Sequence, residues 1–78
     1  MPSGKRTQIK TLMARSINNI DRAMVYLDDL HKMFEPQHPK YAEYLAAMIT
    51  TLLTVREWQL DFWQKAWGSS GENYRSYI

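Results

Sequence analysis

Apolar residues recur every seven positions through the first half of the chain, and no glycine or proline occurs between Lys5 and Glu35. One position of this repeat is always apolar: Met13, Ile20, Leu27 and Phe34. The neighbouring positions are also largely apolar: Ile17, Met24 and His31 on one side, and Ile9, Ser16, Ala23 and Leu30 on the other. A period near 3.5 residues is typical of a helix that packs against other helices. The pattern predicts one long helix over about residues 7–35.

The segment EPQHPKY then predicts a turn. Pro36 disfavours helical geometry at Glu35, and Pro39 suits the first position of a new helix, where its missing N–H needs no partner. Three or four linking residues between two helices favour an antiparallel hairpin. The fold class predicted is therefore all-α.

The second helix is expected over about residues 39–67, and four of its seven heptad positions are mostly apolar. These positions hold Leu45, Leu52, Gln59 and Ala66; Ala42, Ile49, Arg56 and Trp63; Tyr41, Met48, Val55 and Phe62; and Ala46, Leu53, Leu60 and Trp67. They cover about 160° of the circumference at about 100° per residue. Because one neighbouring helix cannot cover so broad a face, we expect the hairpin to assemble into a four-helix bundle or a larger helical oligomer, with a dimer as the simplest case.

The chain is expected to have three parts: a flexible basic arm at residues 1–6, a helical hairpin at 7–68 and a flexible C-terminal tail at 69–78. Gly68 suits the C-terminal cap of the second helix. A 78-residue chain is near the size at which one core gives little stability. Without cysteine it has no disulfide, so oligomerisation or a bound partner is expected to supply the rest.

The segment VREWQLDFWQKAWG, residues 55–68, carries all three tryptophans of the chain. Trp58 and Trp67 lie nine residues apart, about 180° around a helix, so one neighbour cannot cover both. We predict that Trp63 belongs to the hairpin core and Trp58 to an outer interface. Aromatic side chains are common anchors of interfaces. The predicted partner interface comprises Tyr44, Trp58, Phe62, Trp67, Tyr74 and Tyr77, the last two in a tail that is either disordered or a docking segment.

Arg56 interrupts the apolar face of the second helix. A buried arginine without a partner is costly. In an antiparallel hairpin Arg56 comes within reach of Asp21, so we predict an Asp21–Arg56 pair that fixes the register. The alternative is an arginine whose stem is buried and whose head reaches water.

The sequence offers no set of residues for catalysis. It has no cysteine nucleophile and no glycine-rich phosphate loop, and a slender hairpin has no cleft in which a pKa could be shifted for acid–base work. Glu35 and His38 have the spacing of a di-metal motif, with His31 nearby, but Pro36 interrupts the helix inside it. We therefore expect no enzyme activity, no metal and no cofactor.

The basic residues near the N-terminus raise an alternative function, a nucleic-acid-associated module. The candidate contacts are Lys5, Arg6, Lys10, Arg15 and Arg22. A solvated helix surface explains the same charges, and no recognised nucleic-acid motif accompanies them.

The preferred function is a non-enzymatic protein–protein interaction or assembly protein that binds itself and another macromolecule through the aromatic second helix. The N-terminal segment lacks the apolar core of a signal peptide, and the longest uncharged run, residues 44–55, is too short to cross a membrane. We expect a cytoplasmic protein without a membrane partner. In size and class it is comparable with the small helical proteins that bacterial viruses use as assembly factors or as inhibitors of host machinery.

Overall fold

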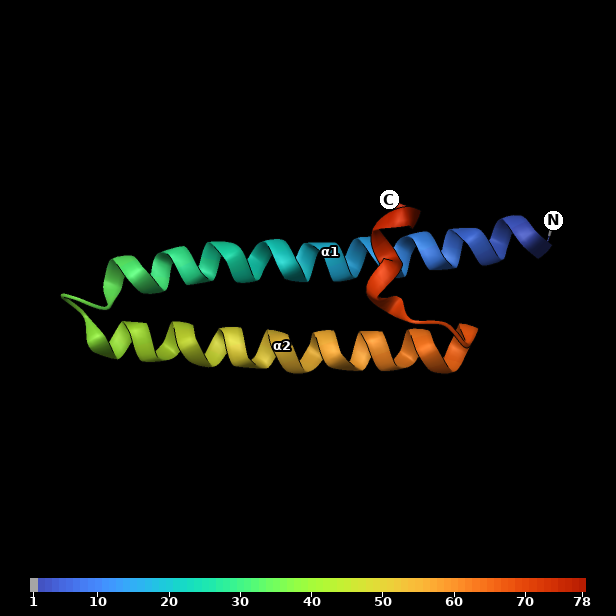
Figure 1. The fold of residues 1–78 in the computed structure, drawn as a ribbon. Helices are drawn as coiled ribbons and strands as arrows, with labels where there is room; N and C mark the ends of the chain where they lie inside the picture. Colours follow the sequence, from blue (N-terminus) through green and yellow to red (C-terminus); the bar gives the residue numbers. More distant parts are fainter. Residues whose placement is uncertain (1) are drawn as a thin grey trace.

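The chain forms two long helices and one short one. The computed structural model describes the backbone of residues 2–78 and the side chains from Lys5 onward. The elements are α1 (Pro2–Phe34), α2 (Pro39–Trp67) and the 3-10 helix η1 (Gly71–Tyr77), with no strand in the described residues. Figure 1 shows α1 and α2 side by side and antiparallel, with η1 folded back over α1. The prediction of an all-α chain is confirmed.

The first helix begins earlier than expected. Residues 2–6, predicted as a flexible arm, are the first turns of α1, which extends past the end of α2 in Figure 1. Pro2 suits the first turn because its missing N–H has no partner there. No residue between Pro2 and Thr7 stops a helix, and Gly4 only weakens one. Met1, the first residue of the predicted arm, lies outside the described residues.

The turn between the helices is short and hydrogen-bonded. The backbone N–H groups of Gln37 and His38 both donate to the carbonyl of Phe34, at 3.2 and 2.7 Å. The rings of Phe34, His38 and Tyr41 lie against one another, with centroids 5.7–6.1 Å apart. Pro39 starts α2 at the predicted position because it tolerates the first helical turn but not the helix interior.

Gly68 ends α2 with the left-handed backbone that suits glycine, at φ 69°. Its N–H donates to the carbonyl of Gln64 at 2.7 Å, which satisfies one of the free carbonyls of the last turn. The Ser70 side chain then accepts from the N–H of Glu72 and caps η1. The reversal at Gly68 directs the chain back toward α1.

The core lies where η1 covers the helix pair. Its fully buried residues are Ala14, Ile17, Trp63 and Tyr74. The Trp63 ring makes edge contacts with Trp67 and Tyr77, at centroid distances of 4.8 and 5.3 Å. The placement of Trp63 agrees with the core position expected from the heptad pattern.

The segment predicted as a flexible tail is therefore part of the core. Gly71 packs so closely that an added Cβ would lie 2.9 Å from Leu60 Cδ2 and 3.1 Å from Trp63 Cβ. Tyr74 is only 2% exposed. Burial of Tyr74, partial burial of Tyr77 and the hydrogen bonds of Tyr74 offset the entropy cost of ordering these residues.

Candidate interaction surface

A hydrogen-bonded ionic group joins all three helices beside the core. Arg56 Nε donates to Asp21 Oδ1 at 2.6 Å, and the Tyr74 hydroxyl donates to Asp21 Oδ2 at 2.6 Å. Arg75 Nε donates to the Tyr74 hydroxyl oxygen at 3.3 Å. The structure thus brings together Asp21 and Arg56, the pair suggested by the sequence. That the pair determines the register stays a prediction.

The environment of Asp21 favours its charged form. Partial burial of the carboxyl acts to raise its pKa. The hydrogen bonds from Tyr74 and Arg56, together with the charges of Arg56 and Arg75, outweigh burial and hold the pKa of Asp21 below its ordinary value. The side chains of Asp21 and Arg56 are 21% and 30% exposed, so the pair is partly shielded from water. This group is built to hold η1 against the helices.

The second helix has a further apolar stripe that the chain itself leaves uncovered. The spacing between its successive residues alternates between three and four, which is the pattern of a coiled-coil seam. They are Tyr41, Tyr44, Met48, Thr51, Val55, Trp58, Phe62 and Lys65. Trp58 and Tyr44 are each 68% exposed. The stripe lies beside the buried side of α2, roughly 120° away from it at about 100° per residue.

The first helix carries a matching stripe with the same alternation. It consists of Ile9, Leu12, Ser16, Asn19, Ala23, Tyr26, Leu30 and Met33. Met33 and Tyr26 are 75% and 67% exposed. This stripe also lies roughly 120° from the buried side of its helix, in the same sense of rotation. Both helices therefore have one seam that packs within the chain and a second seam that is largely exposed. In the second seams Ser16, Ala23 and Val55 are half-buried, and Ser16 Oγ accepts a hydrogen bond from Gln59 Nε2.

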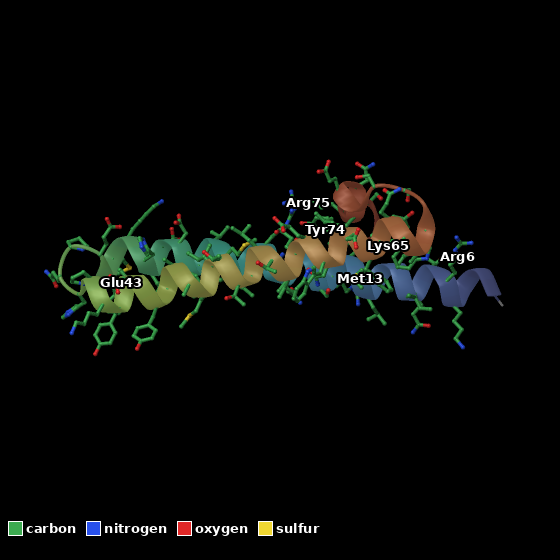
Figure 2. All side chains as sticks on the ribbon, turned by 90° about the horizontal axis from the view of Figure 1, so that it is seen from below. Arg6, Met13, Glu43, Lys65, Tyr74 and Arg75 are labelled. Carbon is green, nitrogen blue, oxygen red and sulfur yellow. The ribbon has the colours of Figure 1, made fainter. Side chains whose placement is uncertain are left out.

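The two exposed stripes lie on one face of the molecule. An equal rotation in the same sense, applied to two antiparallel helices, turns both stripes to the same side. A shallow hollow on this side is lined by residues of both helices, among them Leu27, Tyr44, Met48 and Leu52. The 3-10 helix lies on another side of the helix pair, where Arg75 and Ile78 line a hollow with Arg22 and Val25 of α1, and Figure 2 shows Tyr74 and Arg75 at this end of the molecule. We call the uncovered side, made of the two stripes, the apolar face.

The apolar face gathers most of the exposed hydrophobic side chains. Of the thirteen large hydrophobic residues that are exposed in the described part of the chain, ten belong to it. The three others are Val25, Leu53 and Ile78. Its stripes contain no charged residue except Lys65, which pairs with Asp61 at 2.7 Å at the end of the stripe. Exposed apolar patches of this extent are uncommon on monomeric proteins and are typical of interaction sites.

The residues predicted to contact a partner divide into two groups. Tyr44, Trp58 and Phe62 lie on the apolar face and are at least half exposed. Tyr74 is buried by its own chain, and Tyr77 packs on Trp63, so neither is available to a partner in this structure. Trp67 is also part of the core edge. The difference between the two groups has one cause: η1 returns to the helices instead of extending from them.

The predicted nucleic-acid contacts lie in different surroundings. Lys10 Nζ lies 5.4 Å from the ring centroids of both Trp67 and Tyr77, a cation–π position. Arg22 lines a polar hollow with Arg75 beside η1. Lys5, Arg6 and Arg15 are exposed. Contact of these residues with nucleic acid stays a prediction.

The residues considered for metal binding have other partners. His31 Nδ1 lies 3.3 Å from Glu35 Oε2, and His38 packs on the rings of Phe34 and Tyr41. The described residues contain no group of three or more metal-ligating side chains.

Comparison with known proteins adds no relative. No protein-family model matches the chain, and searches of curated proteins and of solved structures find no match. Within the described residues, neither long helix has a stretch long and apolar enough to cross a membrane. The functional argument therefore depends on the surface itself.

Proposed function

We propose that the protein is a non-enzymatic assembly protein that works by protein–protein association through its apolar face, and that a second copy of the chain is its first partner. The observation that carries the proposal is the pair of exposed heptad stripes on one face. A heptad seam specifies a helical partner, because its side chains insert between those of a facing helix. Two seams side by side specify a partner with two helices, which another copy provides.

The size of the apolar face supports a stable complex. Five of its ten exposed hydrophobic residues are aromatic: Tyr26, Tyr41, Tyr44, Trp58 and Phe62. A fully buried aromatic side chain covers roughly 150–250 Å². At the observed exposures the ten residues offer on the order of 1,000 Å² per copy, above the roughly 800 Å² per partner of a standard interface. Two copies packed face to face would form a four-helix bundle.

Assembly also accounts for the unequal distribution of the core. The buried residues gather near η1, whereas the half of the molecule nearer the turn has only Ala42 and Leu45 buried. The exposed stripes continue through that half. A second copy would cover the side chains that the single chain leaves in water. A foreign protein that binds the α2 stripe would compete with this association.

Charge substitutions on the apolar face test the proposal. We expect Tyr44→Glu combined with Met48→Glu to raise the dissociation constant of the dimer at least about a hundredfold, because the interface would bury unpaired carboxylates. The matched control is Ala46→Glu combined with Leu53→Glu, which adds the same charge to exposed positions of α2 outside the stripe. Sedimentation velocity measures the association and circular dichroism the helix content.

Equal association constants for the two double variants, at unchanged helix content, would contradict the proposal. A wild-type chain that sediments as a monomer up to high concentration would contradict it as well.

A further inference from the structure

Two copies can pack face to face in two symmetric ways. A two-fold axis parallel to the helices places both turns at one end and sets α1 against the partner's α2. A two-fold axis across the helices places the turns at opposite ends and sets α1 against α1 and α2 against α2. An inference about which of these two arrangements forms rests on the proposed self-association. It goes further than that proposal, because it specifies which side chains of the two copies are in contact.

The contacts within one chain fix the heights of residues along the helices. Asp21 lies level with Arg56, and Lys10 lies level with Trp67. Because the helices are antiparallel, each step forward along α1 corresponds to a step backward along α2. Asn19 therefore lies level with Trp58. An axis parallel to the helices leaves all heights unchanged. In that arrangement the α1 stripe therefore faces the α2 stripe of the partner in a register that the single chain already determines.

In the middle of the stripes, the register with both turns at one end pairs small or polar side chains with larger ones, whereas nearer the turns Met33 faces the partner's Tyr44. Asn19 faces the partner's Trp58, and Ser16 faces the partner's Phe62 to within one residue. In the same way, Ala23 faces the partner's Val55 to within one residue. Tyr26 faces the partner's Thr51. Alternation of small and large residues lets facing layers interdigitate. A full overlap with turns at opposite ends would instead set Tyr44 against the partner's Phe62 and Met48 against the partner's Trp58.

The charges beside the stripes favour the same arrangement. Arg15 flanks the α1 stripe between Leu12 and Asn19, and Asp61 flanks the α2 stripe beside Phe62. Both are exposed, and their heights agree to within one residue. With both turns at one end, Arg15 faces the partner's Asp61 twice in the dimer, and each Asp61 also pairs with Lys65 of its own chain. In the full overlap with turns at opposite ends, Arg15 lies level with the partner's Met33 and Asp61 lies level with the partner's Leu45, so neither gains a residue of opposite charge at its own height.

We infer that the partner seated on the apolar face is a second copy related by a two-fold axis parallel to the helices, with Arg15 of each copy beside the partner's Asp61. The dimer then has two different ends. One end displays both turns, with the exposed Lys40 of each copy. The other displays both N-terminal segments with Lys5 and Arg6. At each end of such a dimer, the same segment of both copies is exposed side by side.

A distance measurement between labelled turns tests the inference directly. The chain has no cysteine, so Gln37→Cys gives a single spin-label site in the exposed turn. Helices in contact lie about 8–10 Å apart, so double electron–electron resonance on the dimer should give a label distance below about 30 Å. Turns at opposite ends would give roughly 43 Å, the length of a 29-residue helix.

The three outcomes are distinct. A short distance supports the inference, a distance near the helix length overturns it but leaves the proposed function intact, and the absence of any intermolecular distance overturns both. A matched label at Glu72 in η1, on the far side from the interface, should give a longer distance than the turn label.

Charge reversal supplies an independent test of the contacts. Arg15→Glu should weaken the dimer about tenfold, because two attractive pairs become repulsive. Asp61→Arg should weaken it as well, and the double variant should recover most of the loss. Purely additive losses would overturn the pairing. Arg22→Glu is the control, since exposed Arg22 lies level with the partner's uncharged Val55 in the inferred dimer and its replacement should leave the affinity nearly unchanged.

Discussion

Trp63 and Trp58 lie five residues apart on the same helix, yet Trp63 is 1% exposed and Trp58 is 68% exposed. The two residues belong to the two faces of the helix pair. On the side of Trp63, η1 folds back and completes a core. On the side of Trp58, the heptad seam is equally continuous but nothing in the chain covers it. The difference shows that the chain closes one of its two apolar surfaces by itself and leaves the other uncovered.

The largest expected effect comes from the covered face. Replacement of Trp63 by Ala should lower the free energy of unfolding by about 3–5 kcal/mol, because it removes a fully buried aromatic ring that contacts Trp67 and Tyr77. Thermal or urea denaturation at one fixed protein concentration measures the loss. A loss below about 1 kcal/mol would mean that this face is not the core of the monomer.

An intermediate effect is expected from the ionic group that holds η1. Asp21→Asn should cost about 1–3 kcal/mol at pH 7, because hydrogen bonds to a charged carboxylate are lost. The pKa of Asp21 is lowered in the folded chain, so its contribution is present above the unfolded pKa of about 3.9 and is lost as the pH falls through the folded value.

The pH dependence provides the control for that substitution. As the pH falls below about 4, the stabilities of wild type and Asp21→Asn should move together, and they should converge once the pH is below the lowered folded pKa of Asp21, where the wild-type carboxyl is also neutral. Urea denaturation curves at pH 7 and pH 3 measure this. A constant difference at both pH values would show that the Asp21 charge does not hold η1 in place.

The smallest effect on the single chain is expected at the uncovered face. Trp58→Ala should change the stability of the monomer by less than about 0.5 kcal/mol, as for most exposed positions. The same substitution should weaken association clearly, because an exposed aromatic residue at an interface is a common anchor. Denaturation at high dilution and sedimentation at high concentration separate the two effects. A loss of monomer stability as large as that of Trp63→Ala would contradict the placement of Trp58 outside the core.

The sequence predicts the long elements well because their signals are local. The heptad pattern and Pro39 place the two helices, and Gly68 marks the end of α2. Trp63 could be assigned to the core because it shares a heptad position with Ala42 and Ile49. The Asp21–Arg56 contact could be predicted because, in an antiparallel hairpin that turns near residue 37, those two positions lie at the same height.

The return of η1 was not predicted, because it depends on tertiary contacts. The polar segment GSSGENYRSYI has the composition of a flexible tail. A usable signal is the spacing of Gly71, Tyr74 and Tyr77, every third residue, which places all three on one side of a 3-10 helix. The common face of the two exposed stripes was also missed, since it follows only when both helices are compared relative to their buried sides.

The central claim is that the apolar face is an interface between copies of the chain. Light scattering coupled to gel filtration, over a concentration series of the unmodified protein, tests it most directly. The account predicts a mass of twice the 9.3 kDa of the chain, falling toward the single-chain value only on strong dilution. A well-folded protein that keeps the single-chain mass at every concentration would contradict it.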